Sequence, residues 1–283
     1  MRDLITRHRA VFSALVLAAL GVALVWQFYF RVPPAPLVAV LTGTIATTTP
    51  TLKPAQFDYI EVIDSCNHDY VGTCLRMHSA PSTTSPVVAR LRTGIVFKVA
   101  GTVETNGHTW YKVLFDKNIR YPERITDDWY IYGDAVRLFT DEGDVRAPSK
   151  AAAALLAPLT KRIVVDLSTE TLYAYDGETL FMKEPISTGL EYTPTPKGTF
   201  TIFKKMPSRY MQGPLPGVSS QVYDLPGVPW NLYFTQDGAV IHGAYWHDSF
   251  GKPWSHGCVN LAPQTARKLY EWVDVGTPVT VQY

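Results

Sequence analysis

The sequence has little charge of either sign, and this shortage excludes several classes of protein. Charged residues make up 18% of its 283 positions, too few for a disordered or coiled-coil protein. The formal net charge is +1 and no basic stripe accompanies it, so nucleic acid is not an expected partner. Aromatic residues are plentiful at 12%, which suits β-rich domains with an exposed binding groove.

The N-terminus departs from a soluble pattern. Arg2, Arg7, His8 and Arg9 precede an uninterrupted apolar run over residues 10–30. These roughly 21 residues would form a helix of about 30 Å, the thickness of a bilayer core, and aromatic residues lie at its far end. The run is longer than the apolar core of a signal peptide, so we expect an uncleaved, single-pass anchor. The basic flank keeps the N-terminus inside the cell, which places the rest of the chain on the extracytoplasmic, cell-wall side of the membrane.

Only three cysteines occur, and they fall into two groups. Cys66 and Cys74 lie close together, and an extracytoplasmic compartment permits a disulfide between them, with two separate buried thiols as the alternative. Cys258 is then the odd thiol and a candidate for reactivity.

The composition divides the chain into five segments. Residues 1–31 form the basic stub and anchor, 32–56 a Pro- and Thr-rich spacer, 57–140 a first domain, 141–160 a linker, and 161–283 a second domain. The first domain reads as short strands over 91–100 and 109–115, and Asn106-Gly107 is a strong hairpin signal.

The first domain resembles a bacterial Src-homology-three-like domain, a small β-barrel. The resemblance rests on Leu75-Arg76, Ser79, Pro81-Ser82, Val88 to Leu91, Gly94, Trp110 to Val113 and Trp129 to Ile131. Residues 116–127 look like an insertion. Many members of that family bind cell-wall polymers, so the resemblance implies glycan or peptide binding, with a spacer role as the alternative.

The second domain is predicted to be mainly β with one short helix. Strands are expected over 163–167 and 171–175 around a turn at 168–170. Pro263 fits the first position of a helix, and Ala266, Leu269, Tyr270 and Val273 follow at helical spacing. The segment 206–229 is longer than a simple hairpin needs, and we expect it to form a lid or groove wall.

Cys258 follows Gly257 and comes after a strand pattern, 238–241, that ends at His242. A loop over 244–254 would let His242 meet the thiol across neighbouring strands. An imidazole can take the thiol proton and return it to a leaving amine, and the N–H groups of Gly257 and Cys258 could face a developing oxyanion. Taken singly, each residue is more often structural than catalytic.

A zinc site is a weaker alternative. His242, His247, Asp248, His256 and Cys258 could supply ligands, but no pair has helical HxxxH or Cys-x-x-Cys spacing.

The run Ile241-His242-Gly243 followed by Ser255-His256-Gly257-Cys258-Val259-Asn260 resembles the signature of the YkuD-type L,D-transpeptidase catalytic domain. Further similarity lies upstream in Val164 to Leu167, Leu172 to Tyr175, Ser187-Thr188-Gly189 and Thr193 to Phe200, so the resemblance spans 162–283. It implies Cys258 as nucleophile, His242 as general base and acid, and Gly243 as the carbonyl that orients the His242 ring. His256 and Gly257 would shape the site and its oxyanion hole.

Five further residues are expected to contact substrate: Ser255, Asn260, Tyr245, Trp230 and Tyr233. Many family members carry Arg where this chain has Asn260, which offers hydrogen bonds without charge.

The resemblance implies an enzyme that needs no cofactor or metal and acts on peptidoglycan stem peptides. Its thioester would be resolved by an amine to form a 3→3 cross-link. Three alternatives remain: an L,D-carboxypeptidase that uses water, a non-catalytic wall-binding protein, and a metal enzyme.

Overall fold

The computed structural model describes residues 55–147 and 160–283. The predicted anchor, almost all of the predicted spacer and most of the predicted linker lie outside the described residues. Within the described ranges, no helix is long and apolar enough to cross a membrane.

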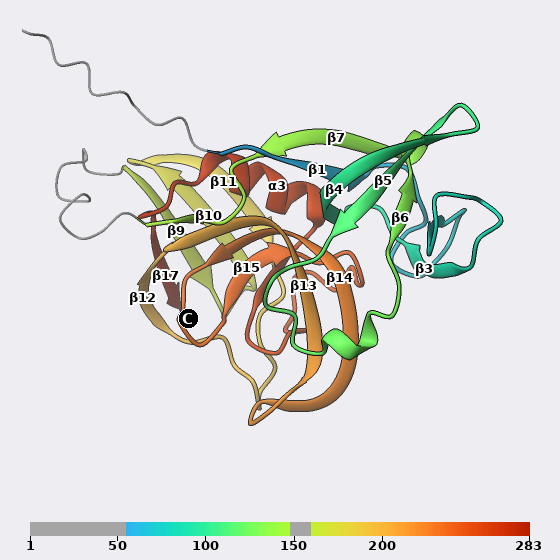
Figure 1. Cartoon of the computed structure of the whole chain (residues 1–283). Helices are drawn as coiled ribbons and strands as arrows, with labels where there is room; N and C mark the ends of the chain where they lie inside the picture. Colours follow the sequence, from blue (N-terminus) through green and yellow to red (C-terminus); the bar gives the residue numbers. More distant parts are fainter. Residues whose placement is uncertain (1–54, 148–159) are drawn as a thin grey trace, which may run out of the picture. The chain divides into compact units, whose positions relative to one another are not determined.

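Residues 57–141 of the first described range form one antiparallel sheet (Figure 1). Its strands are β1 (Phe57–Val62), β2 (Leu75–His78), β3 (Val87–Leu91), β4 (Val96–Thr105), β5 (His108–Leu114), β6 (Tyr130–Tyr132) and β7 (Val136–Asp141). They lie in the order β3-β2-β6-β5-β4-β1-β7, with short 3₁₀ turns η1 (Pro122–Arg124) and η2 (Gly133–Ala135) in the connections. The chain is mainly β here, as the sequence predicts.

The hairpin between β4 and β5 is predicted correctly. Asn106 and Gly107 have φ of 52° and 76°, the left-handed pair that a two-residue hairpin turn requires, and Thr105 pairs with His108 across it. The strand expected over 91–100 is instead interrupted between β3 and β4. Gly94 has φ +92°, and a Cβ there would lie 2.5 Å from Pro263, so the chain turns at this point.

The remaining strands form two five-stranded sheets. One is ordered β11-β10-β9-β17-β12, from β9 (Lys161–Asp166), β10 (Thr171–Asp176), β11 (Thr179–Pro185), β12 (Gly198–Thr201) and β17 (Pro278–Gln282). The other is ordered β16-β15-β14-β13-β8, from β8 (Val145–Arg146), β13 (Lys204–Leu215), β14 (Ser219–Tyr233), β15 (Val240–Gly243) and β16 (Val259–Leu261). β8 falls inside the predicted linker and yet pairs with β13, so sheet structure begins there before residue 161.

The one α-helix in the described residues, α3 (Pro263–Trp272), begins at the predicted proline. Ala266, Leu269, Tyr270 and Val273 are each at most 4% exposed, because their spacing places them on one face of the helix. They pack in the larger core with Ile163, Val165, Leu172, Trp230, Leu232, Phe234, Ile241, Val259, Leu261, Val279 and Val281. Deeply buried apolar surface of this kind is the main stabilising term of the fold.

The two cores share residues from both halves of the chain. Tyr59 of β1 belongs to the larger core, and Val228 of β14 belongs to the smaller core around Ile60, Leu91, Phe97 and Ile131. Within the larger core, aromatic rings join the two halves of the chain: the Phe139 ring centroid lies 5.5 Å from that of Tyr59 and 5.3 Å from that of Trp230. The first sheet therefore packs directly on β13 and β14, the hairpin next to the site described below.

Cys66 and Cys74 form a disulfide, and Cys258 is free.

Candidate active site

Strands β15 and β16 bring the thiol and His242 to one face of a sheet. The two strands are parallel, with Ile241 opposite Val259 and His242 opposite Asn260. Ile241 and Val259 point into the larger core, so by alternation His242 and Asn260 point to the opposite face. Cys258 lies two residues before Asn260 and therefore faces the same way.

His242 is a buried, neutral imidazole. It is 2% exposed, and its Nδ1 lies 3.1 Å from the carbonyl oxygen of Gly243, which accepts the Nδ1 proton. Burial lowers the pKa of His242 to about 4, against the opposing effect of the Gly243 bond. Near pH 7 the ring is uncharged, and Nε2 is left as the basic nitrogen.

The Cys258 thiol is partly exposed and uncharged at rest. Burial raises its pKa, while a hydrogen bond from the Val240 backbone and the charge of Arg209 act in the opposite direction. Within the part of the chain that the structure describes, no hydrogen bond joins Cys258 and His242. The site thus holds a neutral thiol and a neutral base, and proton transfer must accompany nucleophilic attack.

The loop before the cysteine exposes one backbone donor. Ser255 Oγ donates to the Cys258 carbonyl at 2.6 Å and accepts from the Gly257 N–H at 3.1 Å. Gly257 adopts φ +109°, a conformation that a side chain would strain. The Gly257 N–H is therefore already used, contrary to the expectation that it faces an oxyanion. The Cys258 N–H has no acceptor among the described residues and can serve that role.

Two predicted site residues hold the surroundings in place. Ser255 stabilises the loop through the two bonds above. The His256 ring stacks on Tyr223 at 6.1 Å, and its Nε2 lies 3.4 Å from Ser219 Oγ, so His256 faces the β13–β14 hairpin. Both side chains shape the site from beside the thiol.

Asn260 lies in a buried polar pair with His247. The Ser249 N–H donates to His247 Nδ1 at 3.1 Å, so the neutral ring carries its proton on Nε2, 2.9 Å from the Asn260 amide. The atom of Asn260 at this distance is Nδ2, and its Oδ1 is buried with no partner in the described residues.

The three aromatic residues expected to contact substrate lie in different places. Trp230 is 2% exposed and packs in the larger core with Leu232 and Phe234. Tyr245 packs in the smaller core and donates to the Pro226 carbonyl at 2.7 Å. Neither is available to a substrate, and this corrects the expectation for both. Tyr233 lies on the thiol face, because β14–β15 pairing sets it opposite Val240.

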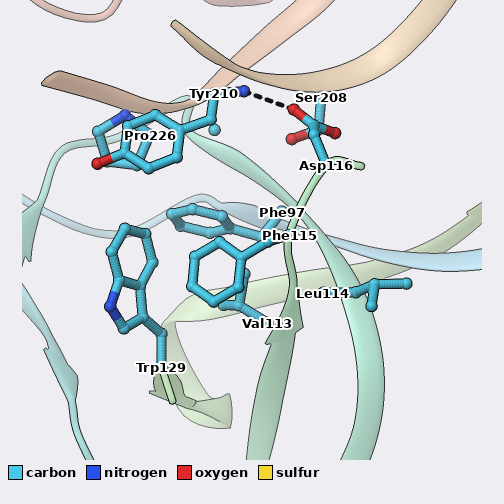
Figure 2. A pocket seen from close by; sticks show the side chains of 10 residues that line it. Phe97, Val113, Leu114, Phe115, Asp116, Trp129, Ser208, Tyr210 and Pro226 are labelled. Atoms are coloured by element: carbon cyan, nitrogen blue, oxygen red, sulfur yellow. Dashed lines mark hydrogen bonds between the residues drawn. The ribbon is translucent and has the colours of Figure 1, made fainter. Parts of the chain in front are cut away.

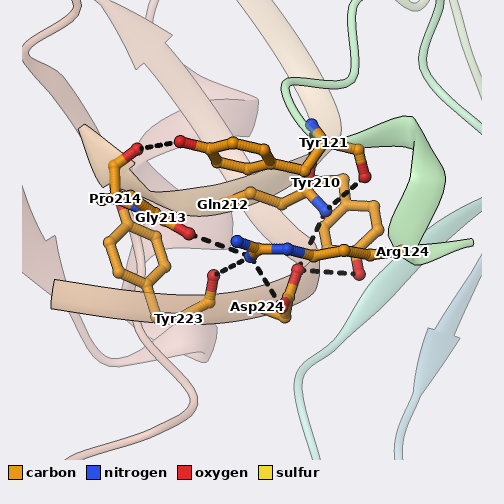
Figure 3. Close-up of polar contacts among 8 residues, drawn as sticks. All are labelled: Tyr121, Arg124, Tyr210, Gln212, Gly213, Pro214, Tyr223 and Asp224. Atoms are coloured by element: carbon orange, nitrogen blue, oxygen red, sulfur yellow. Dashed lines mark hydrogen bonds and ion pairs between the residues drawn. The ribbon is translucent and has the colours of Figure 1, made fainter. Parts of the chain in front are cut away.

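The segment 206–229 is the greater part of the long β13–β14 hairpin, and the first half of the chain holds it. Arg124 Nη1 donates to the Gly213 carbonyl at 2.9 Å and to Asp224 Oδ2 at 3.0 Å (Figure 3). The Tyr121 N–H donates to Gln212 Oε1 at 2.8 Å. These contacts come from the segment 116–127, which the sequence marked only as an insertion.

A small cavity lies at the same junction (Figure 2). It is lined by Phe97, Val113, Phe115, Trp129, Tyr210 and others, with a volume of about 20 Å³. That is room for about one water molecule, so the junction is closely packed.

Among the described residues, no three His, Cys, Asp or Glu side chains gather as a metal-binding group.

The fold and this face define a class: a β-rich domain with a free thiol and a neutral imidazole on one face of a sheet. Residues 160–281 match the family model of the YkuD L,D-transpeptidase catalytic domain. The putative L,D-transpeptidase YkuD of Bacillus licheniformis is 29% identical over 123 residues, 42% of this chain and 64% of that protein. The probable L,D-transpeptidase 3 of Mycobacterium tuberculosis is 35% identical over 104 residues, 35% of this chain and 38% of that protein.

An L,D-transpeptidase structure from Mycobacterium smegmatis aligns with a TM-score of 0.43 and 23% identity, covering 65% of this chain and 98% of the other. The chain spans less than two thirds of the length of the two curated relatives above. Over residues 160–281 the chain is therefore similar to L,D-transpeptidase catalytic domains.

Proposed function

We propose that this protein is a peptidoglycan L,D-transpeptidase that forms 3→3 cross-links through a Cys258 thioester. The observation that carries the proposal is the placement of a free thiol, a neutral imidazole and an unpaired Cys258 N–H on one face of a parallel strand pair. These are the nucleophile, base and oxyanion donor that acyl transfer needs.

In the first step, Cys258 Sγ attacks the carbonyl of the third, diamino-acid residue of a tetrapeptide stem. His242 Nε2 takes the thiol proton, and the Cys258 N–H donates to the developing oxyanion. Collapse of the tetrahedral intermediate breaks the bond to the terminal D-Ala, whose amine receives the proton from His242.

In the second step, a side-chain amine of a neighbouring stem attacks the thioester. His242 accepts the amine proton, collapse of the tetrahedral intermediate breaks the C–S bond as the new amide forms, and His242 returns the proton to the Cys258 sulfur.

Purified disaccharide-tetrapeptide and the full chain test the activity. Cross-linked dimers with loss of D-Ala are expected from the wild type and not from Cys258→Ala, together with a carbapenem adduct seen by intact mass on the wild type alone. Tripeptide without dimer would mean an L,D-carboxypeptidase. Dimers from the Cys258→Ala chain, or no product and no adduct from the wild type, would refute a cysteine enzyme.

The proposal includes a location. The apolar run over 10–30 supports an N-terminal anchor, with the catalytic residues on the cell-wall side. The Cys66–Cys74 disulfide suits an oxidising compartment outside the cytoplasm. A protease added to intact spheroplasts should degrade residues 57–283, and their protection would refute this orientation.

The first half is proposed to be an Src-homology-three-like domain that binds wall polymer and braces the β13–β14 hairpin. Its contacts with the hairpin support the second role (Figure 3). Sedimentation with purified sacculi, using the Cys258→Ala chain, tests the first. A chain that stays wholly in the supernatant would refute wall binding.

A further inference from the structure

Arg209 of β13 carries a positive charge that no carboxylate of the protein neutralises at close range. Its Nη1 donates to the Tyr233 hydroxyl, and its guanidinium carbon lies 5.4 Å from the centre of that ring. In the described part of the chain, no carboxylate oxygen lies within 4.0 Å of it. A partly buried arginine is normally paired, because its desolvation needs an opposite charge.

Strand register places this charge beside the thiol. Tyr233 is opposite Val240 across β14 and β15, and the Val240 backbone forms a hydrogen bond with the Cys258 thiol. Residues paired across strands share a face, so the Tyr233 side chain lies on the Cys258 face. The guanidinium attached to its hydroxyl is close enough to lower the pKa of the Cys258 thiol.

Asp116 is the carboxylate whose charge acts on Arg209, and its side chain is held by another partner. Its Oδ2 accepts a hydrogen bond from the Tyr210 N–H at 2.8 Å (Figure 2). The positive charges of Lys204 and Lys98 act on the Asp116 carboxylate as well as that of Arg209. Burial raises the pKa of Asp116, which weakens it further as a counter-charge. Arg209 therefore keeps N–H donors for a ligand.

We propose that Arg209 binds the terminal carboxylate of the substrate residue that is expelled when Cys258 is acylated. The proposal rests on the function proposed above. That carboxylate belongs to the residue that follows the attacked carbonyl, and the Cα atoms of these two residues are only about 3.8 Å apart. Arginine pairs with carboxylate through two parallel N–H donors, and this fixes orientation as well as affinity. A pentapeptide stem has an amide at the same position and cannot make the ion pair, so Arg209 selects tetrapeptide donors.

The test compares a tetrapeptide donor with the same donor amidated at its C-terminus. For the wild-type full chain, amidation is expected to lower kcat/KM about 10- to 100-fold, the value of one charged hydrogen-bonded pair. Arg209→Met should process the acid about as slowly as the amide, while Arg209→Lys should keep part of the discrimination. Arg90→Met, which removes an exposed charge on β3, is the matched control and should behave as wild type.

Binding separates this proposal from the proposed activity. Calorimetry with the Cys258→Ala chain should give a dissociation constant 10- to 100-fold lower for the acid than for the amide, and this preference should vanish when Arg209→Met is added. An equal preference in both chains would overturn the role of Arg209 even if the enzyme is active. Loss of iodoacetamide reactivity at Cys258 in Arg209→Met, with acid and amide slowed equally, would show a structural role and also overturn it. A wild type that binds acid in preference to amide but forms no product would instead overturn the proposed activity.

Discussion

Mild acid should destabilise the protein through His242. Its imidazole is 2% exposed and its pKa is about 4, against about 6.5 in an unfolded chain. The folded state thus resists protonation between these values while the unfolded state accepts the proton. Stability that is present above pH 6.5 must fall as the pH drops toward 4.

The size of the effect follows from the shift. A difference of about 2.5 pKa units corresponds to about 3.4 kcal/mol once the pH is below both values, and to about 2 kcal/mol at pH 5. Chains with His242→Gln cannot take up this proton in either state. Between pH 7 and pH 5, the wild type should therefore lose about 2 kcal/mol of unfolding free energy more than the variant loses.

Urea titrations followed by tryptophan fluorescence at the two pH values measure that change, and all groups common to both chains cancel. Titration of the His242 ring by NMR gives its pKa directly. An unchanged free-energy difference, or a ring that titrates near 6.5, would refute the argument that burial keeps this base neutral.

Three further outcomes are expected. Iodoacetamide should alkylate Cys258 with an apparent pKa above the ordinary value of about 8.5, since burial outweighs the opposing effects; a midpoint below 7 would mean a resting thiolate. Gly189→Ala should lower turnover at least tenfold and lower the free energy of unfolding by about 1–3 kcal/mol, because its Cβ would lie 2.1 Å from the Thr193 carbonyl oxygen. Gly101→Ala is the control, since a Cβ at Gly101 meets no atom within 4 Å. Equal turnover and stability of the two variants would contradict the close packing around Gly189. Arg124→Gln should raise KM more than it lowers kcat, and it should speed hydrogen exchange in the β13–β14 hairpin. Lys112→Gln removes the ion pair with Asp128 and is the control, in which the kinetic constants and the exchange rates should stay unchanged. A hairpin in Arg124→Gln that is as protected as in the wild type would show that Arg124 does not hold the hairpin.

The elements closest to a strong local signal were predicted best. Asn106-Gly107 turns where only left-handed backbone fits, and Pro263 opens a helix whose apolar spacing matches its buried face. The interruption at Gly94 was missed, because the surrounding residues are all typical of strands and the close approach of Pro263 comes from a distant part of the chain.

The substrate-contact predictions show the same limit. Trp230 and Tyr245 are expected to contact substrate, yet the packing of the two cores buries both. The roles of Arg209 and Arg124 had no local signal, since each depends on a partner that lies far along the chain or in another element.

The sequence by itself determined the chemistry. A scarce thiol, a histidine followed by glycine, and the Ser-His-Gly-Cys run are all local, so their spacing carries the information. Tertiary structure alone decided the electrostatics and the walls of the site. Burial makes His242 neutral, the Ser255 loop consumes the Gly257 N–H, and the β13 strand brings the charge of Arg209 to Cys258. These effects depend on distance and exclusion of water, which residues separated along the chain acquire only when it folds.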